Sequence, residues 1–552
     1  MTETTVFTAT KIITMNDSQP EASAVAVRGG RILAVGSLDE MEAWGSFSID
    51  NTFCDKVLLP GFVEAHSHSV VGGFWEYPYV GHFDRVAPDG RHITGCRSIA
   101  AVIERLRAAD ADLDDPEEPL IAWGLDPIYF SGESVRAATL DRVSTTRPVY
   151  VHHMSGHIVS VNTTLMRHEG IDAESETVGI VKDGSGQPVG ELQGMPAIMS
   201  VRSVFERLWS SLNASTAKWR FGHIARNAGV TTASELGAAA VTPEAIRQWQ
   251  LVVNDPAFPA RIVIAYSNRF GGPSDPAQMA AQAARLAEHS SDKLRLGTIA
   301  KIWLDGSIQG FTARLRWPYY LNGTNGLWYI APERFREELL AYHNAGLTVH
   351  VHANGDEATD LLLDTVEQVL LASPRPDHRH TAQHNQLASA DQFRRMARLG
   401  MSANMFINHI YYWGDQHLTE TVGPERADRM NALATAKRTG VQFSMHSDEM
   451  VTPLGGVMLV WSAVNRVTAT GQVLGKQERI SLHDALRAVT VDAAYQLKMD
   501  HEVGTIECGK WADFAVLEAD PFAVDAMALK DIPVWGVVLA GKLHPADGRG
   551  RE

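Results

Sequence analysis

A unit in which an amphipathic helix ends at a glycine and a short β-branched strand follows at once recurs along this chain. The segments FGHIARNAG, ERFREELLAYHNAG, ADQFRRMARLG and DRMNALATAKRTG lead into strand candidates at residues 230–234, 347–352, 401–405 and 441–446, respectively. Strands that alternate with helices in this way normally pair in parallel. The repeat therefore predicts an α/β fold with a parallel sheet.

Further strand candidates bring the number to eight, which closes a barrel. They lie at residues 57–65, 260–266, 297–303 and 379–383. A doubly wound open sheet is the alternative. Polar residues follow many separate strands at their carboxyl ends, and this favours a TIM-like (β/α)8 barrel.

The two ends of the chain have a different pattern. VFTATKIITM and ASAVAVRGGRILAVGS near the start, and ADFAVLEADP and VWGVVLAGKL near the end, alternate apolar and polar residues. We expect residues 1–57 and 503–546 to form a small composite β-sandwich domain beside a barrel at residues 58–502. The stretch of about 70–215, after barrel strand one, is too long for a simple connection and predicts an inserted lid or subdomain.

Composition excludes several classes of function. The chain has 49 Lys and Arg against 65 Asp and Glu, a net charge of -16 that opposes binding to nucleic acid or to anionic membranes. The start lacks the pattern of a signal peptide, and Cys54, Cys96 and Cys508 are too scattered for a disulfide framework. These features predict a cytoplasmic protein whose partner is a small molecule.

The segment LPGFVEAHSHS places two histidines on one face of a strand. His66 and His68 are two residues apart, so both side chains project the same way and together can hold one metal ion. An H-x-H pair arises easily by chance among 22 histidines, so the pair alone is a weak signal. Further candidates occur in GTIAKIWLDGS, LTVHVHANGDEA, RHTAQH and QFSMHSD, each at the end of an expected strand.

These motifs, together with the late segment GTIECGKWADFAVLEADP, resemble the amidohydrolase superfamily, and specifically its YtcJ-like branch that includes N-substituted formamide deformylases. The resemblance covers nearly the whole chain. It implies a metal centre built from His66, His68, Lys301, His352, His384 and Asp448. It also implies one or two divalent ions, most simply Zn2+, with two ions bridged by a carboxylated Lys301. Imidazole and carboxylate are suitable zinc ligands. A homodimer is common in the superfamily.

Several positions allow another interpretation. An ordinary lysine ammonium repels a metal ion, so Lys301 is alternatively a solvated lysine or one paired with Asp305. His350 faces the same way as His352, so their roles are exchangeable by sequence. Gln383 stands where the branch usually has a glutamate, which weakens a supporting role for that position but leaves His384 as a ligand.

Asp448 is the predicted catalytic residue. A carboxylate beside a metal-activated hydroxide can take its proton and deliver it to a leaving amine. The alternative is a helix N-cap ahead of Thr452.

Aromatic residues mark the predicted substrate pocket. In MFINHIYYWGD, the similarity to deformylases suggests that His409 contacts the substrate carbonyl, with Tyr412 and Trp413 beside it. Trp75 after strand one and His157 in the insertion are further candidates. Packing of the lid explains the aromatic residues equally well, and a structural role explains His157 nearly as well.

The sequence therefore predicts a metal-dependent hydrolase that cleaves a C–N bond of an amide, N-formyl or N-acyl small molecule with an apolar or aryl substituent. The alternatives on the same metal centre are a carbamate, cyclic amide or ester hydrolase, or a deaminase. A non-catalytic barrel scaffold, or a metal-independent lyase or isomerase, is the alternative from another class.

Overall fold

The computed structural model describes residues 3–130, 134–237, 241–268 and 272–547. The chain divides into two compact units, one formed by Met1–Ser69 together with Gly222–Glu552, and the other by Val70–Phe221. Within the described ranges, no helix is both long and apolar enough to cross a membrane.

The larger unit contains parallel strands that alternate with helices. They form two parallel sheets, and isolated parallel bridges, Tyr266 to Ala300 and Ser67 to Glu449, link these sheets. One sheet has the order β15 (Leu294–Arg295), β14 (Arg261–Ile264), β13 (Val230–Glu235), β5 (Phe62–Ser67). The other has the order β16 (Ile299–Trp303), β17 (Thr348–Ala353), β18 (Thr381–His384), β19 (Ser402–Met405), β20 (Gln442–Met445). Each of the eight expected segments overlaps one of these strands, and β15 lies outside all of them.

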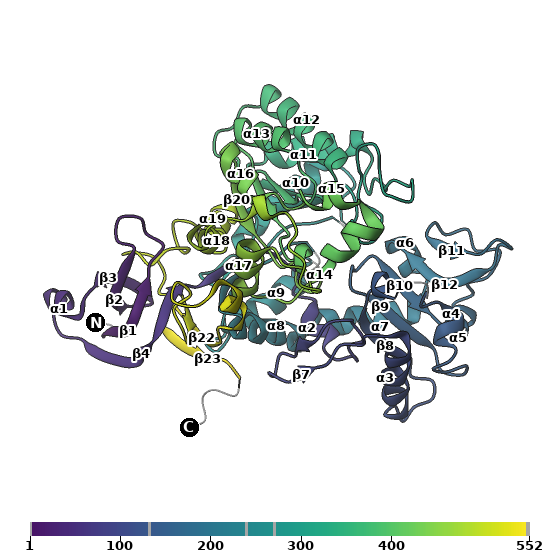
Figure 1. Ribbon diagram of the computed structural model, residues 1–552, viewed down its shortest axis with the longest axis horizontal. Coiled ribbons are helices and arrows are strands. Elements are labelled where there is room, and N and C mark those ends of the chain that lie inside the picture. The colour runs from purple at the N-terminus through teal and green to yellow at the C-terminus, as the bar shows by residue number, and fades with distance from the viewer. Residues whose placement is uncertain (1–2, 131–133, 238–240, 269–271, 548–552) are drawn as a thin grey trace. The chain divides into compact units, whose positions relative to one another are not determined.

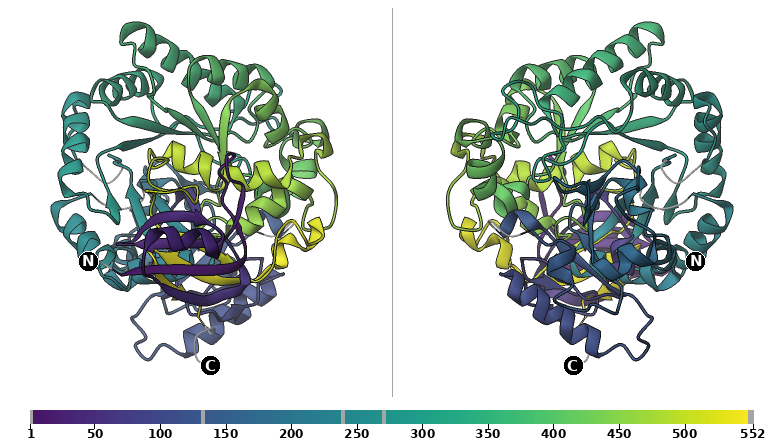
Figure 2. Two further views of the ribbon diagram at one scale, coloured as in Figure 1. Left: turned by 90° about the vertical axis from the view of Figure 1, so that its left-hand side faces the viewer. Right: turned by 90° about the vertical axis from the view of Figure 1, so that its right-hand side faces the viewer.

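Helices cover the outside of these strands, as the teal and green ribbons of Figure 2 show. They include α11 (Pro332–Asn344), α12 (Asp356–Ala372), α13 (Ala390–Arg398) and α16 (Leu433–Thr439). Local sequence sets their ends. Ser389 and Gln392 form a capping box at the start of α13, and Gly440 ends α16 with a left-handed φ of 79°. Helices cover the outer face of the sheets, and every residue of β17 is buried, including His350 and His352, which indicates that the inner face is filled as well.

The two ends of the chain share one seven-stranded sheet, drawn in purple and yellow in Figure 2. Its order is β23 (Lys542–Pro545), β22 (Val534–Leu539), β21 (Phe514–Leu517), β4 (Ser48–Pro60), β1 (Thr4–Ile13), β2 (Glu21–Arg28), β3 (Arg31–Gly36). Its apolar core includes Phe7, Phe53 and Phe514. The sheet confirms that both ends pair with each other; the second layer of a sandwich stays a prediction.

A break after Pro60 separates the terminal sheet from the barrel strands. The expected strand at 57–65 is in fact the end of β4 followed by β5. Gly61 lies between them, and a Cβ there would come within 1.9 Å of the Thr231 hydroxyl oxygen. Glycine at this position lets β5 approach β13.

The smaller unit has its own sheet and core. Its five strands run in the order β11 (Ile180–Lys182), β12 (Pro188–Gln193), β10 (Ile158–Val161), β9 (Val149–His153), β8 (Leu120–Leu125), as labelled in Figure 1. Helix α3 (Ile99–Ala111) packs its apolar face on this sheet through Val102 and Leu106. Trp75 and His157 belong to this unit.

Candidate metal centre

The six predicted ligands lie at the carboxyl ends of five barrel strands. His66 is in β5 and His68 follows it, Lys301 is in β16, His352 is in β17, His384 ends β18, and Asp448 follows β20. Apart from the partly exposed His68, their side chains are buried. Buried ionisable groups at this end of a barrel are typical of an active site.

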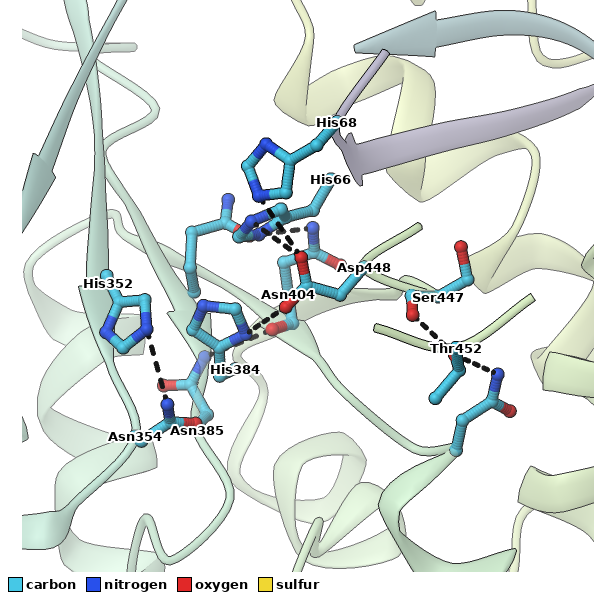
Figure 3. Close-up of polar contacts among 12 residues, drawn as sticks. His66, His68, His352, Asn354, His384, Asn385, Asn404, Ser447, Asp448 and Thr452 are labelled. Atoms are coloured by element: carbon cyan, nitrogen blue, oxygen red, sulfur yellow. Dashed lines mark hydrogen bonds and ion pairs between the residues drawn. The ribbon is translucent and has the colours of Figure 1, made fainter. Parts of the chain in front are cut away.

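Asp448 is the centre of the cluster. Its Oδ1 lies 3.5 Å from His66 Nε2 and 3.3 Å from His68 Nε2, and its Oδ2 lies 3.7 Å from His384 Nδ1 (Figure 3). The candidate ligand atoms of His66, His68 and Asp448 all lie within 4.8 Å of one another. One cation of ordinary size can therefore be reached by all three side chains.

His446 is a further member that the sequence did not single out. Its ring stacks on that of His66 at 4.6 Å and 16°. Its ligand atom lies within 4.8 Å of those of His66 and His384, which makes a second group able to hold a metal ion. His446 comes two residues before Asp448, so the same i, i+2 argument that selected His66 and His68 could have found it.

Several of these buried atoms lack a hydrogen-bond partner among the described residues. They are both ring nitrogens of His384, both ring nitrogens of His446, and Oδ1 of Asp448. A buried polar atom without a partner costs about 1–3 kcal/mol, so native proteins rarely leave several together. A bound cation would satisfy lone pairs of all three side chains. The donor set therefore fits a divalent metal ion.

The backbone is strained at two of the candidate ligands. His384 has a φ of 75° and Asp448 a φ of 55°, in the left-handed region that non-glycine residues seldom adopt. Such strain costs about 1–3 kcal/mol and persists where the surrounding structure requires it, commonly at functional sites. In both residues the positive φ changes the direction of the side chain where the strand ends.

A carboxylate behind His352 orients its ring. The Nδ1 of His352 lies 3.1 Å from Asp305 Oδ1, and Asp305 in turn accepts hydrogen bonds from the backbone N–H groups of Asn354 at 3.0 Å and Gly355 at 2.9 Å. Because the ionised carboxylate only accepts, His352 donates from Nδ1 and carries its lone pair on Nε2. This is the arrangement found behind metal-ligating histidines.

Gln383 supports His66. Its Oε1 accepts a hydrogen bond from His66 Nδ1 at 2.7 Å, and its Nε2 donates to His350 Nδ1 at 2.8 Å. The other nitrogen of His350 lies 3.2 Å from the Gln496 carbonyl oxygen. Both nitrogens of His350 thus have partners inside the protein, whereas Nε2 of His352 has, among the described residues, only a long contact of 3.4 Å to Asn354 Nδ2. The glutamine that departs from the family pattern still acts as a supporting residue.

Burial controls the charges of the histidines. It lowers the pKa of His66 and of His384 well below the ordinary value, and the neighbouring positive charges lower them further. These rings are therefore neutral, as metal ligands must be. His68 differs, because the nearby carboxylates of Asp448 and Glu235 outweigh the effect of burial and raise its pKa to about 9. A cation that binds His68 must displace this proton.

Lys301 is buried, with 2% of its surface exposed, which rules out the solvated form. It pairs in register with His350 across β16 and β17. Gly237 makes room for it, since a Cβ on Gly237 would lie 3.2 Å from Lys301 Cβ and 2.7 Å from the Trp303 ring. Asp305, its suggested ion partner, instead binds His352 and backbone N–H groups.

The predicted pocket residues in the larger unit follow β19. His409 and Trp413 are buried and Tyr412 is half-buried, all on α14 (His409–Gln416). The Phe406 ring lies 4.5 Å from that of His409 and 4.8 Å from that of His446. His409 and Trp413, whose rings are 4.5 Å apart, are thus one aromatic ring away from the metal-binding cluster.

The smaller unit holds the other two candidates for the substrate pocket. Trp75 is half-buried, and its ring lies 5.1 Å from that of Trp123 in an edge-on arrangement. His157, also half-buried, directly precedes β10. Their roles stay predictions.

Comparison with known proteins identifies the family. The Amidohydrolase family profile matches residues 55–544. The chain belongs to this family. An N-substituted formamide deformylase of Arthrobacter pascens is 25% identical over 548 residues, covering 95% of this chain and 95% of the relative. The Protein LONG AFTER FAR-RED 3 of Arabidopsis thaliana is 27% identical over 532 residues, covering 94% of this chain and 88% of the relative.

A solved structure has the same fold. A metal-dependent hydrolase from Pyrococcus horikoshii superposes with a TM-score of 0.71 at 18% identity, covering 95% of this chain and 99% of that one. The parallel strands and helices in the larger unit of this amidohydrolase therefore form a TIM-barrel-like α/β fold. The expected resemblance is confirmed, and the chain is a hydrolytic enzyme.

Proposed function

We propose that this amidohydrolase cleaves a C–N bond of an amide, N-formyl or N-acyl small molecule that carries an apolar or aryl substituent. The observation that carries the proposal is the group of buried imidazole and carboxylate atoms around Asp448, several of which make no hydrogen bond within the described residues. Family membership supports hydrolysis, and the aromatic residues Tyr412 and Trp413 beside His409 support the apolar substituent.

We assign His66, His68, Lys301, His352, His384 and Asp448 to the metal centre, with Zn2+ as the ion. A divalent ion bound there supplies Lewis acidity, which lowers the pKa of water and polarises a carbonyl oxygen. Lys301 is the position that decides between one ion and two. As a carbamate it would carry a negative charge and could hold a second cation, whereas as an ammonium it would allow only one. His352, oriented by Asp305, is the ligand rather than His350.

Asp448 moves the proton. Burial by itself raises the pKa of Asp448, but the nearby positive charges of His68 and Lys301 lower it overall, so the carboxylate is ionised at neutral pH. In that form it accepts a proton from the attacking water and passes it to the leaving nitrogen. His68, 3.3 Å away, keeps the accepting oxygen oriented.

The same residues suit hydrolysis of a carbamate, cyclic amide or ester, or deamination, because each begins with water attacking an unsaturated carbon. A barrel without catalysis is disfavoured, since a scaffold has no reason to keep strained ligands at His384 and Asp448.

The test combines elemental analysis of the purified protein with a hydrolysis screen over N-formyl, N-acyl and anilide compounds and over esters and carbamates, before and after chelation. We expect stoichiometric zinc and amide cleavage that is lost with the chelator and restored by added zinc. Cleavage of esters or carbamates alone selects that alternative. A protein without metal that gains neither metal nor activity when zinc is added contradicts the proposal.

A further inference from the structure

A buried chain of hydrogen bonds leads away from His409. Its Nδ1 lies 3.0 Å from Nε2 of His417, and Nδ1 of His417 lies 2.8 Å from the Thr421 hydroxyl oxygen. The two rings are nearly parallel at 15°, and all three residues are buried. His417 and Thr421 are brought together by the π-helical turn His417–Thr421, an uncommon element that often occurs at functional sites.

The hydroxyl group fixes the direction of this chain. If His417 donated to Thr421, the hydroxyl proton would have no acceptor, because within the described residues the Thr421 hydroxyl bonds only to His417. A buried donor without an acceptor costs about 1–3 kcal/mol. In the opposite direction Thr421 donates to Nδ1 of His417, and His417 donates from Nε2 to Nδ1 of His409. Each N–H or O–H proton of Thr421 and His417 in this chain then has an acceptor.

The consequence for His409 is a defined tautomer. Its Nδ1 accepts, so a neutral ring must carry its proton on Nε2. That nitrogen makes no hydrogen bond within the described residues. Across the Phe406 ring from His409 lies His446, a member of the metal-binding cluster. The free N–H of His409 is thus the end of the chain nearest to the reacting groups.

We propose that Thr421 and His417 are positioning residues that hold His409 as a neutral hydrogen-bond donor, with Nε2–H directed at the carbonyl oxygen of the substrate. This rests on the proposed function and refines it, because it makes His409 an electrophilic partner of the carbonyl and excludes it as a general base. A neutral donor fixed in advance stabilises the negative charge that develops on oxygen in the transition state.

The charge state of both rings agrees with this assignment. Burial lowers the pKa of His417 to about 3, and burial together with His417 and His446 lowers that of His409 well below its ordinary value. Both rings therefore stay neutral at physiological pH, and each carries a single N–H.

The first experiment measures the tautomers directly and needs no turnover. Ring 15N chemical shifts of histidine-labelled protein separate protonated from unprotonated nitrogens, and His409→Phe and His417→Phe variants assign the signals. We expect a proton on Nε2 in both rings. A proton on Nδ1 of His409 would overturn the proposal, whether or not any amide is hydrolysed.

The second experiment tests the positioning role by steady-state kinetics. The substrate is formanilide, an aryl formamide, if the wild-type protein hydrolyses it, and otherwise an amide that the screen identifies. His409→Phe should lower kcat by about 100-fold, the usual loss for one oxyanion donor. His417→Phe should lower kcat about 10-fold with KM within twofold, as for a supporting residue. His417→Gln can still donate to His409 and should recover most of kcat.

Unchanged metal content and thermal midpoint in His417→Phe serve as the control for folding. Wild-type kcat in that variant, or equal losses in His417→Gln and His417→Phe, would contradict the positioning role. If the wild-type protein cleaves no amide in the screen, the proposed function fails, while the tautomer measurement still decides the hydrogen-bond chain.

Discussion

Two groups of buried histidines lie at opposite ends of the barrel strands. At the amino ends, His343, His378 and His380 have every ring nitrogen bonded within the protein. His343 donates from Nε2 to the Ser373 carbonyl at 2.8 Å, and its Nδ1 lies 2.9 Å from His380 Nε2. His380 Nδ1 accepts from the Val349 backbone N–H at 3.0 Å.

At the carboxyl ends, His384 and His446 of the metal centre are equally buried but bonded differently. His384 and His446 make no ring hydrogen bond within the described part of the chain. Burial is therefore the same in the two groups, and the difference lies in the partners. A histidine whose ring nitrogens are hydrogen-bonded within the protein has a structural role. Ring nitrogens without such partners, near a carboxylate, can instead bind a cation.

Loss of the central carboxylate should have the largest effect. We expect Asp448→Asn to lower kcat by about 1,000-fold, because the amide cannot take up a proton. Its metal content should remain, since the histidine ligands are intact. Steady-state kinetics with elemental analysis checks this, and activity near that of the wild type would remove Asp448 from its role.

In the group at the amino ends of the strands, a substitution should affect stability alone. His380→Phe leaves the Val349 N–H and His343 Nδ1 without partners, so we expect the free energy of unfolding to fall by about 2–5 kcal/mol. The folded fraction should keep its metal content and kcat. Urea denaturation measures this, with the exposed His483→Gln as a control expected to change stability by less than about 0.5 kcal/mol. A large drop in kcat of the folded protein would erase the distinction between the two groups.

His446 tests whether open nitrogens indicate a metal function. His446→Phe should weaken zinc binding by about 10- to 100-fold, measured by competition with a chelator. The metal-free variant should be at least as stable as the metal-free wild type, because an apolar ring replaces a buried imidazole without partners. Unchanged zinc affinity would assign His446 to packing.

The smallest expected effect is on the pH dependence of stability, through His380 of the amino-end group. Burial, together with His378, holds the pKa of His380 well below 6.5, so this ring stays neutral when the unfolded chain takes up a proton. The unfolded state then binds more protons, and stability falls as the pH drops below about 6.5. For His380 the expected slope is up to about 1.4 kcal/mol per pH unit. Urea midpoints from pH 7.5 to 5.5 in His380→Phe should fall less steeply than in the wild type, and equal slopes would contradict this.

The sequence predicted the barrel strands well because helix-glycine-strand units leave a strong local pattern. It missed the break at Gly61, since the run LLPGFV is apolar throughout and the break depends on how closely Thr231 approaches. The predicted metal ligands followed from their places at strand ends and from the family resemblance.

The partners behind those ligands were harder to predict. The bond between Gln383 and His66 joins residues 317 positions apart, and it depends on how the strands are arranged in space. The turn that brings Thr421 to His417 has no recognised signal in HLTET, because a π-helical turn depends on the surrounding packing. Sequence patterns therefore reveal which groups can bind a metal but not which tautomer each ring adopts.

The terminal sheet has a consequence for how the chain is synthesised. Strand β4 lies between β1 and β21, so one of its edges is covered only after residues 514–517 have left the ribosome. Until then, the amino-terminal strands expose an open edge during translation of more than four-fifths of the chain, and such edges promote aggregation. The segment of β4 that β21 covers is the apolar Val57–Pro60, and the charged residues Asp55 and Lys56 directly precede it. Charges next to an apolar strand segment act against aggregation while that segment is unpaired.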